Sequence, residues 1–108
     1  MIKVNFKRQA NKLVSFTVSG HAGFDEYNRD IVCSAVSALT ITVINGLTEI
    51  LKVKAEIVVE EGFTELSLSR LSDTEIDKCQ ILMETLLLGL KSMEIQYGKY
   101  IMLKMEEV

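Results

Sequence analysis

The sequence predicts an α+β fold, a single two-layer domain in which a mixed sheet packs against two helices. Three observations predict it. Several short segments alternate apolar and polar residues, the period of half-buried strands, whereas two longer segments repeat apolar residues at helical spacing. These elements follow one another in the order ββαββαβ. The length of 108 residues, with no Pro and no internal repeat, fits one domain over residues 1–108.

The first two strands are expected to form a β-hairpin. Ile2, Val4 and Phe6 point one way and the polar residues between them point the other, and residues 14–18 repeat this pattern. Residues 9–11 make a short connection between the two strands. The hairpin therefore ends near Ser19 and Gly20, and a polar loop follows over residues 21–29.

The first helix is expected to begin at Asp30, because aspartate is a good N-cap residue and the apolar period changes there. If Asp30 caps the helix, Cys33 occupies the third helical position. The expected core face consists of Val32, Ala35, Val36, Leu39, Val43, Leu47 and Ile50.

The second half of the chain repeats the order of the first and adds a strand. Residues 55–59 and 63–68 flank a Glu-Glu-Gly turn and predict a second hairpin. Ser72 followed by Glu75 is a capping box that opens the second helix. Its expected core face is Ile76, Cys79, Met83, Leu86, Leu87 and Leu90. Residues 100–105 are apolar on both sides, as expected of a central strand.

Composition and charge exclude several classes of function. The net charge is −3, and scattered Lys and Arg do not make the basic surface that direct nucleic-acid binding requires. The apolar stretch 31–51 is interrupted by Asn45, Thr48 and Glu49, and residues 1–6 do not resemble a signal peptide, so we expect a cytoplasmic protein without a membrane span. One His and two distant Cys suit a four-ligand zinc site poorly; no metal or cofactor is expected.

The two cysteines have different expected roles. Cys79 lies on the apolar face of the second helix, where a thiol behaves as a small hydrophobic group. Cys33 lies near a helix start, where free backbone N–H groups and the helix dipole favour a thiolate nucleophile. A packed and inert cysteine is an equally good interpretation of Cys33 from its position alone.

His21 is the only histidine, and it lies where a strand meets a polar loop. Taken alone it is best interpreted as a solvated loop residue. Together, Cys33 and His21 are the two parts that an activated thiol requires, provided that the fold brings them within hydrogen-bond reach.

The segment from Gly20 to Ser37 closely resembles the signature of the Prp family of ribosomal-processing cysteine proteases. In that family a Gly-His-Ala element precedes a short loop, and an Asp-Ile-Val-Cys element follows it, with Ala-Val-Ser after a small residue. Residues 20–22, 30–33 and 35–37 match these elements. Asn28 departs from the pattern, which has Gly there, but Asn tolerates the same left-handed backbone.

The resemblance implies a cysteine endopeptidase in which Cys33 attacks the scissile carbonyl and His21 transfers the proton. It also implies the substrate, a ribosomal protein of the large subunit, numbered twenty-seven, from which a short N-terminal extension is removed after an aromatic residue. Asp30 either caps the helix or orients His21. Ser37 either hydrogen-bonds within the site or bonds back to its own helix.

The loop between the two catalytic candidates is expected to act as a mobile lid for the substrate. Gly23 and Asn28 give it turn conformations, and Phe24 and Tyr27 could contact an aromatic substrate side chain or pin the loop to the core. The alternative function is a non-catalytic, ribosome-associated protein-binding module in which Cys33 is only packed.

The first helix has more apolar residues than one core face needs. Ile41 and Ile44 are among those that remain once the core face is filled, and they hint at a homodimer.

Overall fold

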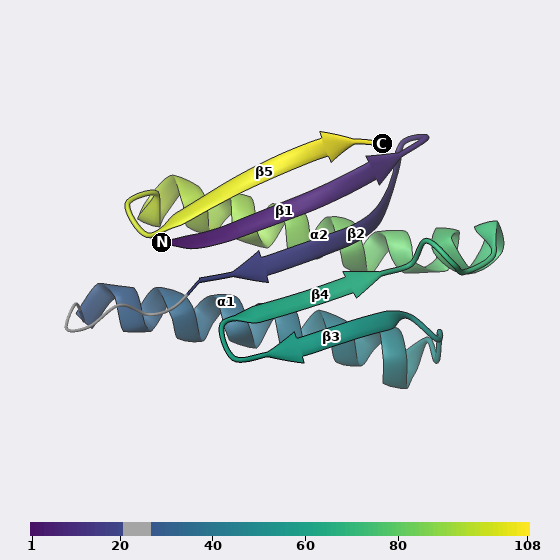
Figure 1. Cartoon of the computed structure of the whole chain (residues 1–108), viewed down its shortest axis with the longest axis horizontal. Helices are drawn as coiled ribbons and strands as arrows, with labels where there is room; N and C mark the ends of the chain where they lie inside the picture. The colour runs from purple at the N-terminus through teal and green to yellow at the C-terminus, as the bar shows by residue number, and fades with distance from the viewer. Residues whose placement is uncertain (21–26) are drawn as a thin grey trace.

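The computed structural model describes residues 1–20 and 27–108 of the chain, and the side chains of residues 27–30 are left out of the description. Its elements run in the order β1 (Ile2–Gln9), β2 (Lys12–Ser19), α1 (Tyr27–Asn45), a π-helical turn η1 (Gly46–Ile50), β3 (Glu56–Glu60), β4 (Phe63–Ser67), α2 (Asp73–Tyr97) and β5 (Ile101–Glu107). The predicted order ββαββαβ is confirmed (Figure 1).

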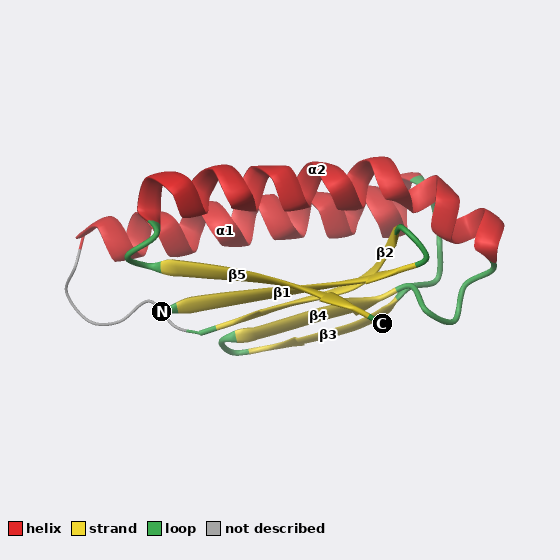
Figure 2. Cartoon of the chain, turned by 90° about the horizontal axis from the view of Figure 1, so that it is seen from above, coloured by secondary structure: helices red, strands yellow, loops and turns green. Residues whose placement is uncertain are grey.

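The strands form one five-stranded sheet in the order β3-β4-β2-β1-β5. Three pairs of neighbours are antiparallel, and β1 runs parallel to β5, so the sheet is mixed, as predicted. Both helices lie on one face of this sheet and leave the other face open (Figure 2). The core lies between the two layers and includes Phe6 and Phe16, whose rings contact each other at a centroid distance of 5.5 Å.

Helix α2 is the element that the sequence predicts best. The side chain of Ser72 accepts a hydrogen bond from the backbone N–H of Glu75, and the Glu75 carboxylate accepts one from the Ser72 N–H, which completes the capping box. The predicted core face is confirmed, since the buried residues of α2 are Ile76, Cys79, Met83, Leu86, Leu87 and Leu90.

Helix α1 begins earlier than predicted, at Tyr27, so Asp30 lies within the helix and the predicted N-cap position is wrong. Aspartate is favourable both at an N-cap and in the first turns of a helix, and its presence therefore marks a helix start only approximately. Leu39 and Ile50 also differ from the prediction, because they are 38% and 81% exposed. Leu39 lies beside Gly89 of α2, and Ile50 is the last residue of η1, where the helical period changes.

Strand β5 is an edge strand, and the prediction that it is central is wrong. The prediction took the apolar residues of this strand to be buried, but Met102 and Met105 are 39% and 37% exposed. Only Ile101 is fully buried on this strand, opposite Ile2 in the parallel register. A pattern that is apolar on both sides therefore does not require neighbours on both edges.

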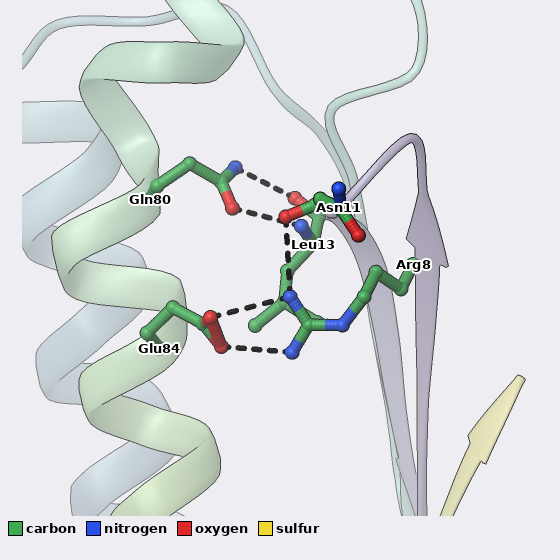
Figure 3. A network of polar contacts seen from close by, with 5 residues as sticks. All are labelled: Arg8, Asn11, Leu13, Gln80 and Glu84. Atoms are coloured by element: carbon green, nitrogen blue, oxygen red, sulfur yellow. Dashed lines mark hydrogen bonds and ion pairs between the residues drawn. The ribbon is translucent and has the colours of Figure 1, made fainter. Parts of the chain in front are cut away.

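The β1–β2 turn and α2 are joined by a polar network, which we call the turn network (Figure 3). Gln80 accepts a hydrogen bond from the backbone N–H of Leu13 at 2.8 Å and donates one to the Leu13 carbonyl at 2.9 Å. Arg8 forms a two-pronged ion pair with Glu84 and also donates to the Asn11 carbonyl. Positive φ angles at Ala10 and Asn11 give the tight turn of a two-residue hairpin.

The stretch Ile31–Ile50 is long and apolar enough to cross a membrane by length and composition alone. The core helix of a soluble protein can meet the same test. In this structure a third of the stretch is buried inside the molecule, and Val32, Val43 and Leu47 belong to the core.

Candidate active site

Gly20 directly follows the last residue of strand β2 and precedes the predicted base in the chain, and only glycine fits there. Its φ is +115°, and a Cβ at this position would lie 2.3 Å from the carbonyl oxygen of Met1. The N–H of Gly20 donates to the carbonyl of Gly62 at 3.0 Å. The end of β2 is therefore fixed beside the turn that joins β3 to β4.

Cys33 lies in the second turn of α1, because the helix begins at Tyr27 rather than Asp30. The favourable effect of a helix N-terminus on a thiolate is largest in the first turn, so the predicted activation by the helix start is weakened. The side chain is half-buried and packs against the core, with part of its surface open to solvent.

The residues one, two and three turns beyond Cys33 line a groove. Ser37, Thr40 and Ile44 follow at spacings of four, seven and eleven residues, which place them along the same face of α1. The groove has a volume of about 250 Å³ and lies between α1 and the ends of β2, β3 and β4. Its lining residues are Val18, Gly20, Ser37, Thr40, Ile41, Ile44, Val59, Glu60, Gly62, Phe63 and Thr64.

Two of these lining residues connect the groove to the predicted catalytic pair. Gly20 directly precedes His21, and Ser37 lies one helical turn beyond Cys33. In the structure, the end of β2 and the face of α1 that carries the predicted nucleophile thus meet at the same groove. Ser37 itself is exposed, with room for contacts beyond its own helix.

Thr40 is a functional candidate that the sequence did not indicate. It is only 3% exposed, and its hydroxyl has no hydrogen-bond partner within residues 1–20 and 27–108. A threonine within an apolar helix is ordinarily interpreted as a core position. What distinguishes Thr40 from an ordinary core threonine is that it lines the groove, which β3 and β4 help to form.

Cys79 has the properties of a structural thiol, as predicted from its place on α2. It is fully buried, and the two cysteines form no disulfide. Burial, with a smaller contribution from Glu75, raises the pKa of the Cys79 thiol. A buried thiol with a raised pKa is a poor nucleophile near neutral pH.

Several predicted site residues fall on the segment that the structure leaves out. His21, Gly23 and Phe24 lie outside the described residues, and with them most of the predicted lid. Tyr27 and Asn28 were expected in that loop but begin helix α1. In the described part of the chain, no group of three or more His, Cys, Asp or Glu side chains could hold a metal ion.

Comparison with known proteins gives consistent matches over most of the chain. The family model described as "Cysteine protease Prp" matches residues 1–102. The ribosomal processing cysteine protease Prp of Staphylococcus aureus is 28% identical over 92 residues, which cover 85% of this chain and 86% of that protein. The protein of the same name from Bacillus subtilis is 28% identical over 101 residues and 90% of each chain.

Solved structures give the same result. A crystal structure of a Streptococcus mutans protein is 31% identical, with a TM-score of 0.91 over 100% of this chain and 96% of that one. The S. aureus essential ribosomal processing protease in complex with a substrate peptide is 26% identical, with a TM-score of 0.85 over 98% of this chain and 100% of that one. The described fold is therefore shared along the whole chain.

Proposed function

The chain belongs to the Prp family of cysteine proteases, and from that membership we propose that it removes a short N-terminal extension from a ribosomal protein of the large subunit, the one numbered twenty-seven. One observation carries the proposal. The groove is lined both by Gly20, which precedes the proposed base, and by Ser37, which follows the proposed nucleophile on its helix. A peptide in this groove would therefore contact the residue that precedes His21 in the chain and the residue one helical turn beyond Cys33.

The proposed mechanism uses Cys33 as the nucleophile and His21 as the base. His21 takes the proton of the Cys33 thiol, and the sulfur attacks the scissile carbonyl carbon. The C–N bond then breaks, His21 returns the proton to the departing amine, and an acyl-enzyme remains. Water, deprotonated by His21, hydrolyses the thioester and regenerates the thiol.

The relatives support a covalent route. The S. aureus protease has been solved with a substrate peptide and also with a covalently linked product peptide. Within this chain, the raised pKa and complete burial of Cys79 leave Cys33 as the better nucleophile. Membership in a protease family also decides against the non-catalytic binding module that the sequence left open.

Asp30 and Ser37 have supporting roles in this proposal. Because α1 begins at Tyr27, the capping role of Asp30 loses its basis, and we assign it the other role, the orientation of His21. Ser37 lines the groove and is assigned a contact within the site.

The setting of the reaction is part of the same proposal. We assign the enzyme to the cytoplasm. We assign the ribosomal protein rather than a nucleic acid as its partner, because a net charge of −3 does not favour binding to a phosphate backbone. A homodimer is also proposed. Ile41 and Ile44 both line the groove, but Ile41 is 57% exposed and Ile44 is half-buried, so Ile41 is the residue of the two with apolar surface left for a second copy of the chain.

The test is to incubate the extended ribosomal protein with purified enzyme and to follow its cleavage by mass spectrometry of the intact protein. The parent protein should remove the extension at one site, and Cys33→Ala and His21→Ala should each lose several orders of magnitude in rate. Cys79→Ala is the matched control and should cut at the parent rate. Asp30→Asn should fold normally and lose most of its rate if its charge orients His21.

Two outcomes would contradict the proposal. Cleavage by Cys33→Ala at the parent rate would remove the nucleophile assignment. A parent enzyme that leaves the ribosomal protein intact but cuts other peptides would keep the protease and remove this substrate.

A further inference from the structure

Thr40 differs from the other helical threonines whose hydrogen bonds are known. Thr42, Thr48 and Thr85 each donate to the carbonyl four residues earlier, at 2.7, 3.0 and 2.6 Å. Thr40 is the most deeply buried threonine on α1, and its hydroxyl has no partner among the described residues. A helix ordinarily satisfies such a hydroxyl from within its own backbone.

An unpartnered buried hydroxyl is costly, so its retention needs an explanation. One other side-chain atom shares this state in the described chain, Oδ1 of Asn5. Asn5 still donates through its amide nitrogen to Glu106, on the open face of the sheet. Thr40 has no such second contact, and it lines the groove.

The walls around Thr40 define what the groove can hold. Ile41, Ile44 and Val59 provide apolar surface, and Thr40 is a buried lining residue whose hydroxyl lies beneath that surface. A hydroxyl can donate or accept a hydrogen bond once a ligand group reaches it. A peptide supplies the matching chemistry, because each of its residues pairs a side chain with a main-chain carbonyl. Sites that bind small ligands combine an apolar lining with a few such polar groups.

We propose that Thr40 is a specificity-determining residue of the protease: when the peptide binds, the side chains around Thr40 shift, and its hydroxyl donates a hydrogen bond to a main-chain carbonyl of the peptide. An apolar side chain of that peptide lies against Ile41, Ile44 and Val59. This inference rests on the proposed function, because it assigns the groove to the peptide substrate.

The test compares Thr40→Val with Thr42→Val, in a steady-state assay with a peptide that spans the cleavage site. Valine keeps the shape of threonine and removes the hydroxyl. Thr40→Val should lower kcat/KM about tenfold, mainly through KM, because the peptide carbonyl then lacks its donor. Its melting temperature should not fall, since an unpartnered hydroxyl has been removed from the folded protein.

Thr42→Val is the matched control, because it removes an exposed hydroxyl that bonds only to its own helix. Its kcat/KM should equal that of the parent. Thr40→Ser keeps a hydroxyl and should recover most of the lost kcat/KM.

The outcomes separate this inference from the proposed function. A Thr40→Val enzyme with parent kcat/KM, or one that unfolds at a clearly lower temperature or fails to fold, overturns the assignment of Thr40, because the hydroxyl is then structural. A parent enzyme that does not cut the peptide at all overturns the proposed function first, and the role of Thr40 with it.

Discussion

The two ends of the sheet differ in how their buried polar groups are satisfied. At the end that holds the β1–β2 turn, the turn network pairs both backbone groups of Leu13 with Gln80, and Arg8 with Glu84. At the opposite end, the end of β2 and the β3–β4 turn lie together (Figure 1). There the β3–β4 turn lines the groove, and Thr40, whose buried hydroxyl has no partner among the described residues, lines it as well. The hydrogen-bonded groups of the turn network make the first end rigid. The second end retains a hydroxyl that is still able to form a hydrogen bond with a ligand.

This difference predicts that substitutions at the two ends separate stability from activity. Substitutions that remove a hydrogen bond of the turn network should lower the free energy of unfolding and leave turnover unchanged. Substitutions of groove residues should lower turnover. Their effect on the free energy of unfolding should depend on whether the new side chain strains the backbone. The following substitutions are ordered by the size of the expected effect.

Gly20→Ala should have the largest effect, because it acts at the groove end on both properties. The added Cβ meets the carbonyl of Met1 in a backbone conformation that L-residues rarely adopt, which should cost about 3 kcal/mol. Displacement of the adjoining His21 should reduce kcat/KM as well. Urea unfolding and steady-state kinetics measure the two.

Gly89→Ala is the matched control for this prediction. A Cβ there would make only an ordinary contact, 3.7 Å from Leu39, within a helix. It should stabilise the protein by about 0.5–1 kcal/mol, because alanine is the better helix former. Equal effects of the two substitutions would show that Gly20 is not strained as described.

Gln80→Ala should have the next largest effect, confined to stability. It removes the partners of the buried Leu13 backbone N–H and carbonyl, which should cost about 2 kcal/mol in unfolding. Exposed Gln96 on the same helix provides the control, and Gln96→Ala should change stability by about 0.5 kcal/mol or less. A marked fall in kcat/KM for Gln80→Ala would mean that the two ends are coupled.

Cys79→Ala should cost about 1 kcal/mol, as for a small core truncation, and should keep full activity. The raised pKa of Cys79 gives a pH dependence with a definite sign. The folded protein keeps the thiol proton that the unfolded chain loses above about pH 8.5, so this stabilisation is present below that pH and lost above it.

Urea unfolding at several pH values measures this dependence. The parent should lose stability more steeply than Cys79→Ala as the pH rises above the unfolded thiol's pKa. Parallel pH profiles would contradict the raised pKa. Iodoacetamide at neutral pH should label Cys33 and leave Cys79 intact in the folded protein.

Glu84→Gln should have the smallest effect, about 0.5 kcal/mol, because the Glu84 side chain is 42% exposed and water screens its ion pair with Arg8. The hydrogen bond to Glu84 raises the pKa of Arg8, which remains charged in any case. Thermal unfolding in low and high salt measures the pair, and the difference between parent and variant should shrink in salt. A difference that persists in salt would contradict a screened pair.

The accuracy of the sequence predictions depended on how local the determining interactions are. Helix α2 was predicted with its cap and its whole buried face, because the Ser72 capping box and one uninterrupted period lie within the helix. The start of α1 was missed because Asp30 suits more than one helical position. The edge position of β5 was missed because neighbours in a sheet are set by distant pairing.

The same distinction applies to the site. Cys33 and His21 were found through a contiguous motif, and their catalytic roles remain predictions. Thr40 could not be found, because its importance depends on the β3–β4 hairpin, which follows it by about twenty residues. A buried hydroxyl without a partner is a property of the assembled groove rather than of any sequence segment.

The parallel pairing of β1 with β5 has a consequence for the order of folding. Ile2 pairs with Ile101, so in the described part of the chain this edge of β1 has no partner strand until β5 has been synthesised. Pairs so distant in sequence close slowly, and an unpaired strand edge can meanwhile associate with other chains. Lys3 and Lys7, which alternate with the core residues of β1, carry the charge that opposes such association during synthesis.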